Sequence, residues 1–174
     1  MAEHLLVRVL DAADASEYRE VRLAALNSDP LAFLTSAAEF GARALEDVAA
    51  RLRPSRQSVT FGALLDGTLV GLLTLAREAA PVVAHRANVY GVSVAPAARG
   101  QGCGDALMRS ALEHVHTWPG VTSLHLAVMD TQPAAGRLYE RHGFQVWGRQ
   151  PDAVRRNGRV LSEVWMWRPV ESPS

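Results

Sequence analysis

The sequence predicts an α+β domain built on a mixed, mostly antiparallel sheet of six to seven strands, with about four helices. Asp66-Gly67 separates two apolar runs, residues 59–65 and 69–75, which is typical of a hairpin of antiparallel strands. Farther on, a strand, a glycine-rich loop, a helix and another strand follow one another between residues 87 and 128. That order indicates a β-α-β crossover, so it adds one parallel pair to the sheet.

Length and charge indicate one ordinary globular domain, which we place at residues 1–174. A chain of 174 residues with 48% hydrophobic and 21% charged residues is long enough to bury a core. Eighteen basic residues balance eighteen acidic ones, so no overall field attracts nucleic acid or an anionic membrane. We therefore expect neither partner.

The composition also favours a cytoplasmic location. The single cysteine cannot form an internal disulfide, and the start Met1-Ala2-Glu3-His4 lacks the basic and apolar regions of a signal peptide. The longest apolar stretch, residues 69–76, is far shorter than the roughly 20 residues that cross a bilayer. The expectation is an intracellular protein without a membrane span.

The first quarter of the chain predicts one strand and two helices. Leu5, Val7 and Val9 alternate with other residues as in a strand. A helix is expected over residues 14–27, with Asp14-x-x-Glu17 as a capping pattern. Ser36-x-x-Glu39 caps a second predicted helix that ends by residue 54.

The second half predicts the remaining elements. A strand over residues 87–95 leads into the glycine-rich loop, and the helix after that loop ends near residue 119. A strand over residues 123–128 is followed by a helix over 133–143, which has proline in its first turn and glycine at its end. Two strands, 144–148 and 160–167, surround a turn at 155–159.

The loop between the crossover strand and its helix is a candidate anion site. It reads Arg99-Gly100-Gln101-Gly102-Cys103-Gly104, and its glycines let several backbone N–H groups approach one ligand. A Walker loop would need Gly-Lys-Ser/Thr, and a dinucleotide fingerprint would need its third glycine one residue later. Neither fits, which leaves an anion loop of another kind or a plain glycine-rich turn.

Two segments together resemble the GCN5-related N-acetyltransferase (GNAT) superfamily. The first runs from Val92 through Gly104, and the second, residues 133–144, contains the pairs Leu138-Tyr139 and Gly143-Phe144. The resemblance implies an α/β/α sandwich and a single N-acetyltransferase domain. It also implies a V-shaped opening between the two central parallel strands, filled by the pantetheine arm of acetyl-CoA.

The resemblance assigns roles to individual residues. Acetyl-CoA, the co-substrate, would be held along the strand by Val92, Ser93 and Val94. The loop Arg99, Gly100, Gln101, Gly102, Cys103 and Gly104 would hold its pyrophosphate. Gln132 stands where the family often has an asparagine near the cofactor arm. Tyr139 would be the general acid for the CoA thiolate, and the acetyl group would pass directly to the primary amine of a small molecule.

The family's general base is not found at its usual positions, which here hold Asn88 and Ala127. Glu78, His85 and Glu163 are possible substitutes, and a water chain held by Asn88 or Ser93 is the preferred interpretation. The histidines follow no metal-ligand spacing, so no metal is expected.

The acceptor is the least determined part of the hypothesis. Arg22, Phe33, Phe40 and Tyr90 are candidates for its pocket, although the phenylalanines are ordinary core residues. Two alternatives remain open: a protein or peptide amine as acceptor, and a catalytically weak acyl-CoA-binding sensor. Tryptophans on the last strands fill either a core or a dimer surface, so a homodimer is one expected assembly.

Overall fold

The computed structural model describes residues 4–171, which form one seven-stranded sheet in the order β1-β2-β3-β4-β5-β7-β6. Residues 1–3 and 172–174 lie outside the described residues, and the first of these ranges holds most of the segment on which the signal-peptide expectation rests. The strands are β1 (Leu5–Val9), β2 (Ser58–Leu65), β3 (Thr68–Arg77), β4 (Arg86–Val94), β5 (Ser123–Met129), β6 (Gln145–Arg156) and β7 (Arg159–Pro169). Only β4 and β5 pair in parallel, so the predicted mixed, mostly antiparallel sheet is confirmed.

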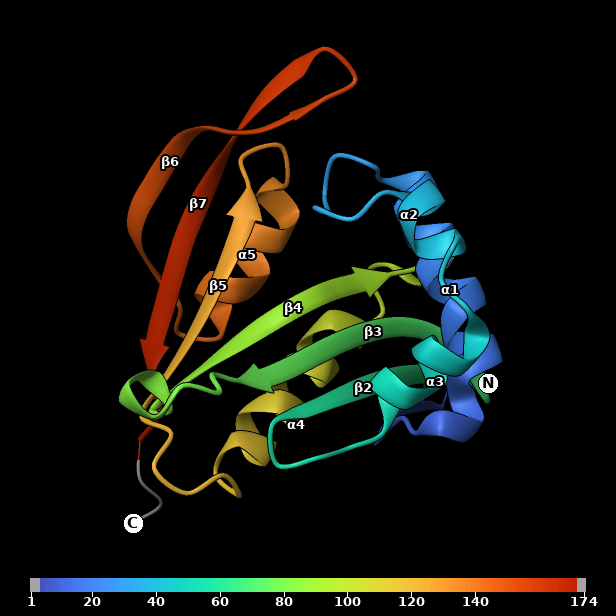
Figure 1. Ribbon diagram of the computed structural model, residues 1–174, viewed down its shortest axis with the longest axis horizontal. Helices are drawn as coiled ribbons and strands as arrows, with labels where there is room; N and C mark the ends of the chain where they lie inside the picture. The colour runs from blue at the N-terminus through green and yellow to red at the C-terminus, as the bar shows by residue number, and fades with distance from the viewer. Residues whose placement is uncertain (1–3, 172–174) are drawn as a thin grey trace.

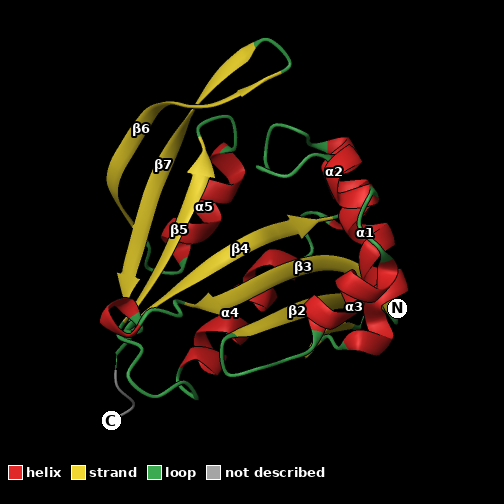
Figure 2. Ribbon diagram, in the orientation of Figure 1, coloured by secondary structure: helices red, strands yellow, loops and turns green. Residues whose placement is uncertain are grey.

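Helices cover the sheet in two groups, and each group has its own core (Figure 2). The first group is α1 (Ala15–Ser28), α2 (Ala37–Gly41) and α3 (Leu45–Leu52), which pack on Leu10, Leu64, Leu69 and Leu72. The second is α4 (Cys103–Val115) and α5 (Pro133–Arg141), whose core includes Leu73, Leu75, Leu107, Met108 and Leu124. Consecutive residues of a strand, such as Leu72 and Leu73, thus belong to opposite cores, because successive side chains of a strand point to opposite faces of the sheet.

The parallel strands β4 and β5 separate after a short paired region. Their register contains three pairs, from Arg86–Ser123 to Asn88–His125, and the strands then diverge (Figure 1). A register shift where β3 meets β4, between the pairs Leu72–Ser93 and Thr74–Tyr90, marks a β-bulge around Gly91. A bulge bends its strand and increases the local twist. The predicted V-shaped opening therefore exists.

The predicted second helix is two helices rather than one. Residues 36–54 contain α2 and α3 with a break at residues 42–44, so the described residues hold five α-helices instead of about four. Ser36 does form the expected capping box, because its side chain accepts from the Glu39 N–H and Glu39 reaches back to the Ser36 N–H. The break turns the chain between two short helices that share the core under α1.

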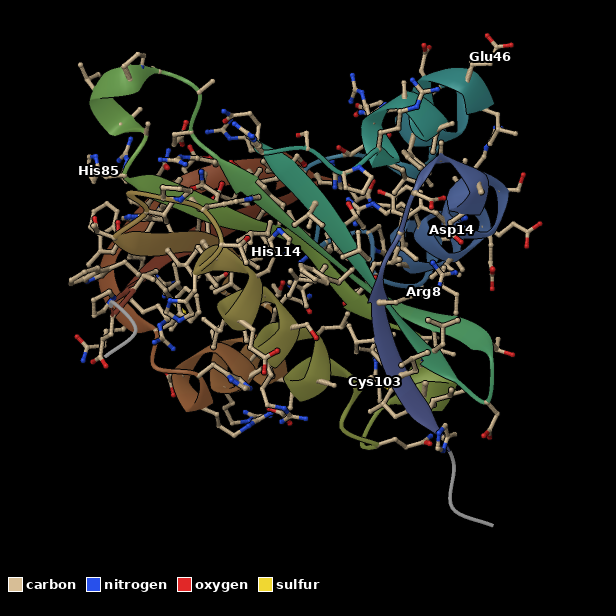
Figure 3. The ribbon with its side chains drawn as sticks, turned by 90° about the horizontal axis from the view of Figure 1, so that it is seen from below. Arg8, Asp14, Glu46, His85, Cys103 and His114 are labelled. Carbon is tan, nitrogen blue, oxygen red and sulfur yellow. The ribbon has the colours of Figure 1, made fainter. Side chains whose placement is uncertain are left out.

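The capping pattern assigned to Asp14 is wrong. Asp14 makes no side-chain cap bond to α1, and its carboxylate instead pairs with Arg8 at 2.7 Å and accepts from the Asp11 N–H (Figure 3). Glu17, the presumed partner, accepts from the backbone N–H of Leu69 on β3. Asp14 and Glu17 therefore bond the start of α1 to the strands β1 and β3 instead of capping the first turn of the helix.

Gly62 in β2 offers a test of this packing. A Cβ there would lie 2.6 Å from Leu69 Cδ1 and 2.7 Å from Leu10 Cδ2, and both leucines are buried. We expect Gly62→Ala to lower the free energy of unfolding by about 1–3 kcal/mol, measured by urea denaturation. Gly148→Ala, where a Cβ meets nothing within 4 Å, is the control and should change it by less than about 0.5 kcal/mol. Equal midpoints for both variants would contradict the packing described.

Candidate active site

A cleft of about 1130 Å³ lies where β4 and β5 separate. Its walls come from α1, the segment 32–35, β4, the loop at 95–104, β5, α5 and β7. Within the cleft, β4 beyond Asn88 and β5 beyond His125 are not paired with each other. Backbone N–H and C=O groups along an unpaired strand edge need hydrogen-bond partners, which a ligand with amide groups can provide.

The glycine-rich loop closes one end of this cleft. Gly100 and Gly102 have φ of 77° and 85°, and Gly102 is the N-cap of α4 without any side-chain cap. A Cβ on either glycine would meet nothing within 4 Å, so the space in front of the loop is open. The first N–H groups of α4 have no partners inside the helix and carry its positive dipole end. The loop is therefore shaped to receive an anion.

Arg99 and Gln101, the two long side chains of the loop, differ in whether they line the cleft. Arg99 is exposed at the rim of the cleft, where its Nε donates to the Val94 carbonyl at 3.2 Å. Gln101 donates to the Ala97 carbonyl at 3.3 Å, and it is the one loop residue from 99 to 104 that does not line the cleft. Its backbone N–H, rather than its side chain, is what it can offer a ligand.

Cys103 and Gly104 hold the loop on the core. Cys103 is 2% exposed, and its Sγ lies 3.8 Å from the Ala98 carbonyl. A Cβ at Gly104 would lie 3.2 Å from Leu138 Cδ2, so α4 and α5 approach closely here. These contacts agree with a small-residue role for Cys103 rather than a nucleophilic one.

Tyr139 reaches the cleft from α5. Its side chain packs edge-on against Phe144, with 6.1 Å between ring centroids, and the residue is only 7% exposed. Among residues 4–171 its hydroxyl has no hydrogen-bond partner, although the residue lines the cleft. Burial raises the pKa of Tyr139, so the hydroxyl keeps its proton at neutral pH. It is a hydrogen donor available to a ligand.

Glu78 enters the cleft beside Asn88. It follows β3 directly, and its Oε1 accepts from Asn88 Nδ2 at 2.9 Å. Burial raises the pKa of Tyr90, and the negative charge of Glu78 raises it further. Glu78 thus brings a carboxylate to the part of β4 where the sequence itself carries only an amide.

The other candidate bases differ in position. Glu163, on β7, also lines the cleft, whereas His85 does not and offers its backbone carbonyl to the N–H groups of Thr122 and Ser123. Of the four residues named as candidates for the acceptor pocket, Arg22, Phe33 and Tyr90 line the cleft. Phe40 is buried in the core beneath α1, against Tyr18.

Two contacts missed by the sequence analysis connect the two sides of the cleft. Gln132, at the start of α5, donates to Asp29 Oδ1 at 3.2 Å, beyond the end of α1. Arg156, at the tip of the β6–β7 hairpin, donates to the carbonyls of Pro30, Phe33 and Leu34. The hairpin is longer than predicted, since β6 continues to Arg156, and this length brings Arg156 to the segment 30–34.

The described part of the chain has neither a metal-ligand cluster nor a helix suited to a membrane. No group of three or more His, Cys, Asp and Glu side chains is placed to hold a metal ion. None of the described helices has the length and apolar character needed to cross a membrane.

A mixed sheet opened between two parallel strands, with a glycine loop at the opening, defines the GNAT fold class. The model of the acetyltransferase (GNAT) family matches residues 6–144, and the chain belongs to this family. The L-amino acid N-acetyltransferase AaaT of Escherichia coli (strain K12) is 30% identical over 106 residues, which cover 61% of this chain and 65% of that protein. The mycothiol acetyltransferase of Brachybacterium faecium is 37% identical over 87 residues, which cover 50% of this chain. The chain spans less than two thirds of either relative, and only 26% of the second.

Solved structures agree on the fold. The protein yncA of Salmonella typhimurium, solved with its cofactor acetyl-CoA, superposes with a TM-score of 0.82 at 19% identity. That superposition covers 98% of this chain and 96% of the other. At this identity the similarity establishes the fold alone.

Proposed function

We propose that this protein is an acetyl-CoA-dependent N-acetyltransferase that transfers the acetyl group directly to the primary amine of a small molecule. One observation carries the proposal. The glycine loop, the edges of β4 and β5 that are not paired with each other, and Tyr139 all line the same cleft. An anion site, an amide-binding edge and a proton donor are what a pyrophosphate, a pantetheine arm and a departing thiolate require.

Acetyl-CoA fits the cleft from its rim inward. Backbone N–H groups from Arg99 to Gly104 would bind the pyrophosphate, with the exposed Arg99 guanidinium adding a charge-assisted contact. Val92, Ser93 and Val94 line the cleft along β4 and would pair with the pantetheine amides. Gln132 lines the cleft too, but its amide nitrogen is engaged by Asp29. We therefore assign Gln132 a structural role, in which its bond to Asp29 joins the two walls of the cleft, rather than a role in binding the co-substrate.

The chemistry then needs proton transfers at the acceptor nitrogen and at the departing sulfur. An alkylammonium acceptor must first lose a proton, and we assign that proton to the Glu78 carboxylate, directly or through one water. The free amine attacks the thioester carbonyl, an N–C bond forms, and the C–S bond breaks. Tyr139 donates its hydroxyl proton to the sulfur that leaves. The second proton, which the nitrogen loses as the amide forms, returns through water to the Tyr139 oxygen and restores the hydroxyl.

Glu78 is favoured as base over the alternatives considered from the sequence. His85 does not line the cleft. Glu163 lines it from β7, without a hydrogen bond to β4, whereas Glu78 is fixed by Asn88 beside the bulged part of that strand. Water held by Asn88 is compatible with this assignment, because the Asn88 side chain and the Glu78 carboxylate are already in contact.

The relatives support a small acceptor. The Escherichia coli relative is named as an L-amino acid N-acetyltransferase, and the Brachybacterium faecium relative as a mycothiol acetyltransferase.

The transfer reaction is tested by the release of free CoA thiol from acetyl-CoA over a panel of primary amines. We expect turnover in the unmodified protein and a loss of about 100-fold in kcat for Tyr139→Phe, because the thiolate loses its proton donor. Affinity for acetyl-CoA, measured by calorimetry, should stay within about twofold, since the ring and its packing on Phe144 remain. Tyr18→Phe, a tyrosine that does not line the cleft, is the control and should keep full kcat.

Two results would decide against parts of the proposal. Full activity in Tyr139→Phe would remove the acid role. Tight binding of acetyl-CoA without turnover of any amine would leave an acyl-CoA sensor instead of an enzyme.

A second variant tests the base. We expect Glu78→Gln to lower kcat/KM by about 100-fold near neutral pH, with the loss shrinking as the pH approaches the pKa of the amine. Asn88 can still bond to the glutamine, so the site should keep its shape. Glu163→Gln is the matched comparison. If it lowers kcat/KM more than Glu78→Gln does, Glu163 on β7 is the general base instead of Glu78.

A further inference from the structure

Arg22 is an arginine on the α1 wall of the cleft that lacks an acidic partner among residues 4–171. The other arginines that line the cleft are Arg99, which donates to a backbone carbonyl, and Arg141, which pairs with Asp105. The side chain of Arg22 projects from α1 and lines the cleft. None of the carboxylates in residues 4–171 forms an ion pair or hydrogen bond with its guanidinium. A guanidinium stays charged at all ordinary pH values, so the wall carries a fixed positive charge.

The surroundings hold this guanidinium in place without satisfying it. Its Cζ lies 4.7 Å from the centroid of the Phe33 ring. A Cβ at Gly91, in the β4 bulge, would lie 3.1 Å from Arg22 Nη1. Contact with a ring face and with a glycine backbone fixes the plane of the group and leaves its N–H donors available to a ligand.

The local charges favour an anion at this point. Burial is the main reason that the pKa of Arg22 is lowered; the neighbouring Tyr18 raises this pKa, and the charge of Arg43 lowers it. The net lowering of the pKa means that the protein itself does not fully compensate the charged form. Partly buried charges are ordinarily paired, so an anion from outside the chain is the missing partner.

The position of Arg22 in the cleft indicates which kind of anion it binds. Arg22 contacts β4 at Gly91, whereas the glycine loop that receives the pyrophosphate begins at Arg99, after the end of the strand. Three residues before Gly91 lies Asn88, which holds the Glu78 carboxylate. That separation is about 10 Å along an extended strand. The guanidinium of Arg22 and the carboxylate of Glu78 thus lie on either side of the bulge. A molecule that carries one carboxylate and one ammonium group can pair with both.

We propose that Arg22 binds the carboxylate of the acceptor, so that the substrate is an amino acid or a similar amino carboxylate whose amine faces Glu78. This inference rests on the proposed transferase function and specifies its substrate class. A guanidinium fork bonds a planar carboxylate through two parallel N–H···O contacts, which orients the amine as well as binding the molecule. A protein N-terminus lacks a carboxylate beside its amine and would leave Arg22 unpaired.

The test compares free L-amino acids with their own carboxamides as acceptors in the CoA-release assay. In the unmodified protein we expect kcat/KM for acids to exceed that for amides by at least tenfold. Arg22→Gln should lower kcat/KM for the acids by about 100-fold and leave the amides within about threefold. Because each acid–amide pair is measured in both proteins, the intrinsic reactivity of the two amines cancels from the ratio. Arg22→Lys should give a partial loss, since it keeps the charge but not the fork.

Controls separate this inference from the transferase proposal. Arg51→Gln, an exposed arginine on α3 that does not line the cleft, should leave every ratio unchanged. Arg22→Gln should keep acetyl-CoA affinity and melting temperature, and if it does not fold, the acid–amide ratio of the unmodified protein decides alone. Turnover of amides or peptides as efficient as that of acids would overturn the carboxylate site and leave the transferase standing. Failure of every amine would overturn the transferase itself.

Discussion

The loss of pairing between β4 and β5 is the constraint on which the rest of the site depends. Two neighbouring parallel strands that are bonded at only three pairs leave backbone groups in the middle of a sheet without partners. Such a gap is stable only if the strands are held from their other sides. The antiparallel pairings of β4 with β3 and of β5 with β7 provide this support over most of each strand. The two halves of the sheet are therefore rigid walls, and the space between them suits an amide-containing ligand.

The contents of the cleft follow from that arrangement. The glycine loop lies at its open end because β4 leads directly into it, and α5 brings Tyr139 from the other wall. Two contacts join the walls of the cleft across its opening. Gln132 at the start of α5 bonds to Asp29, and Arg156 of the β6–β7 hairpin bonds to the segment 30–34 that follows α1. The same cleft can thus receive a co-substrate along β4 and an acceptor beneath α1.

Local patterns predicted the parts that lie within one stretch of chain. The loop at 99–104, the strand before it and the helix bearing Tyr139 each carry glycine, proline or apolar spacing with a direct physical meaning, and all three are found where expected. Long-range contacts were not predictable. Asp29 and Gln132 are 103 residues apart, and Asp14 matched a cap pattern but bonds Arg8 instead. Glu78 could be named from the sequence but not ranked, because its contact with Asn88 depends on the pairing of β3 with β4.

The central claim is that acetyl-CoA occupies the gap as an additional strand. Backbone amide hydrogen exchange, measured residue by residue with and without acetyl-CoA, tests it most directly. We expect binding to slow amide exchange along residues 89–94 of β4 and in the loop at 99–104, with little change in β1 and β2. Binding that leaves the β4 amides unchanged, or that protects a different region, would contradict it.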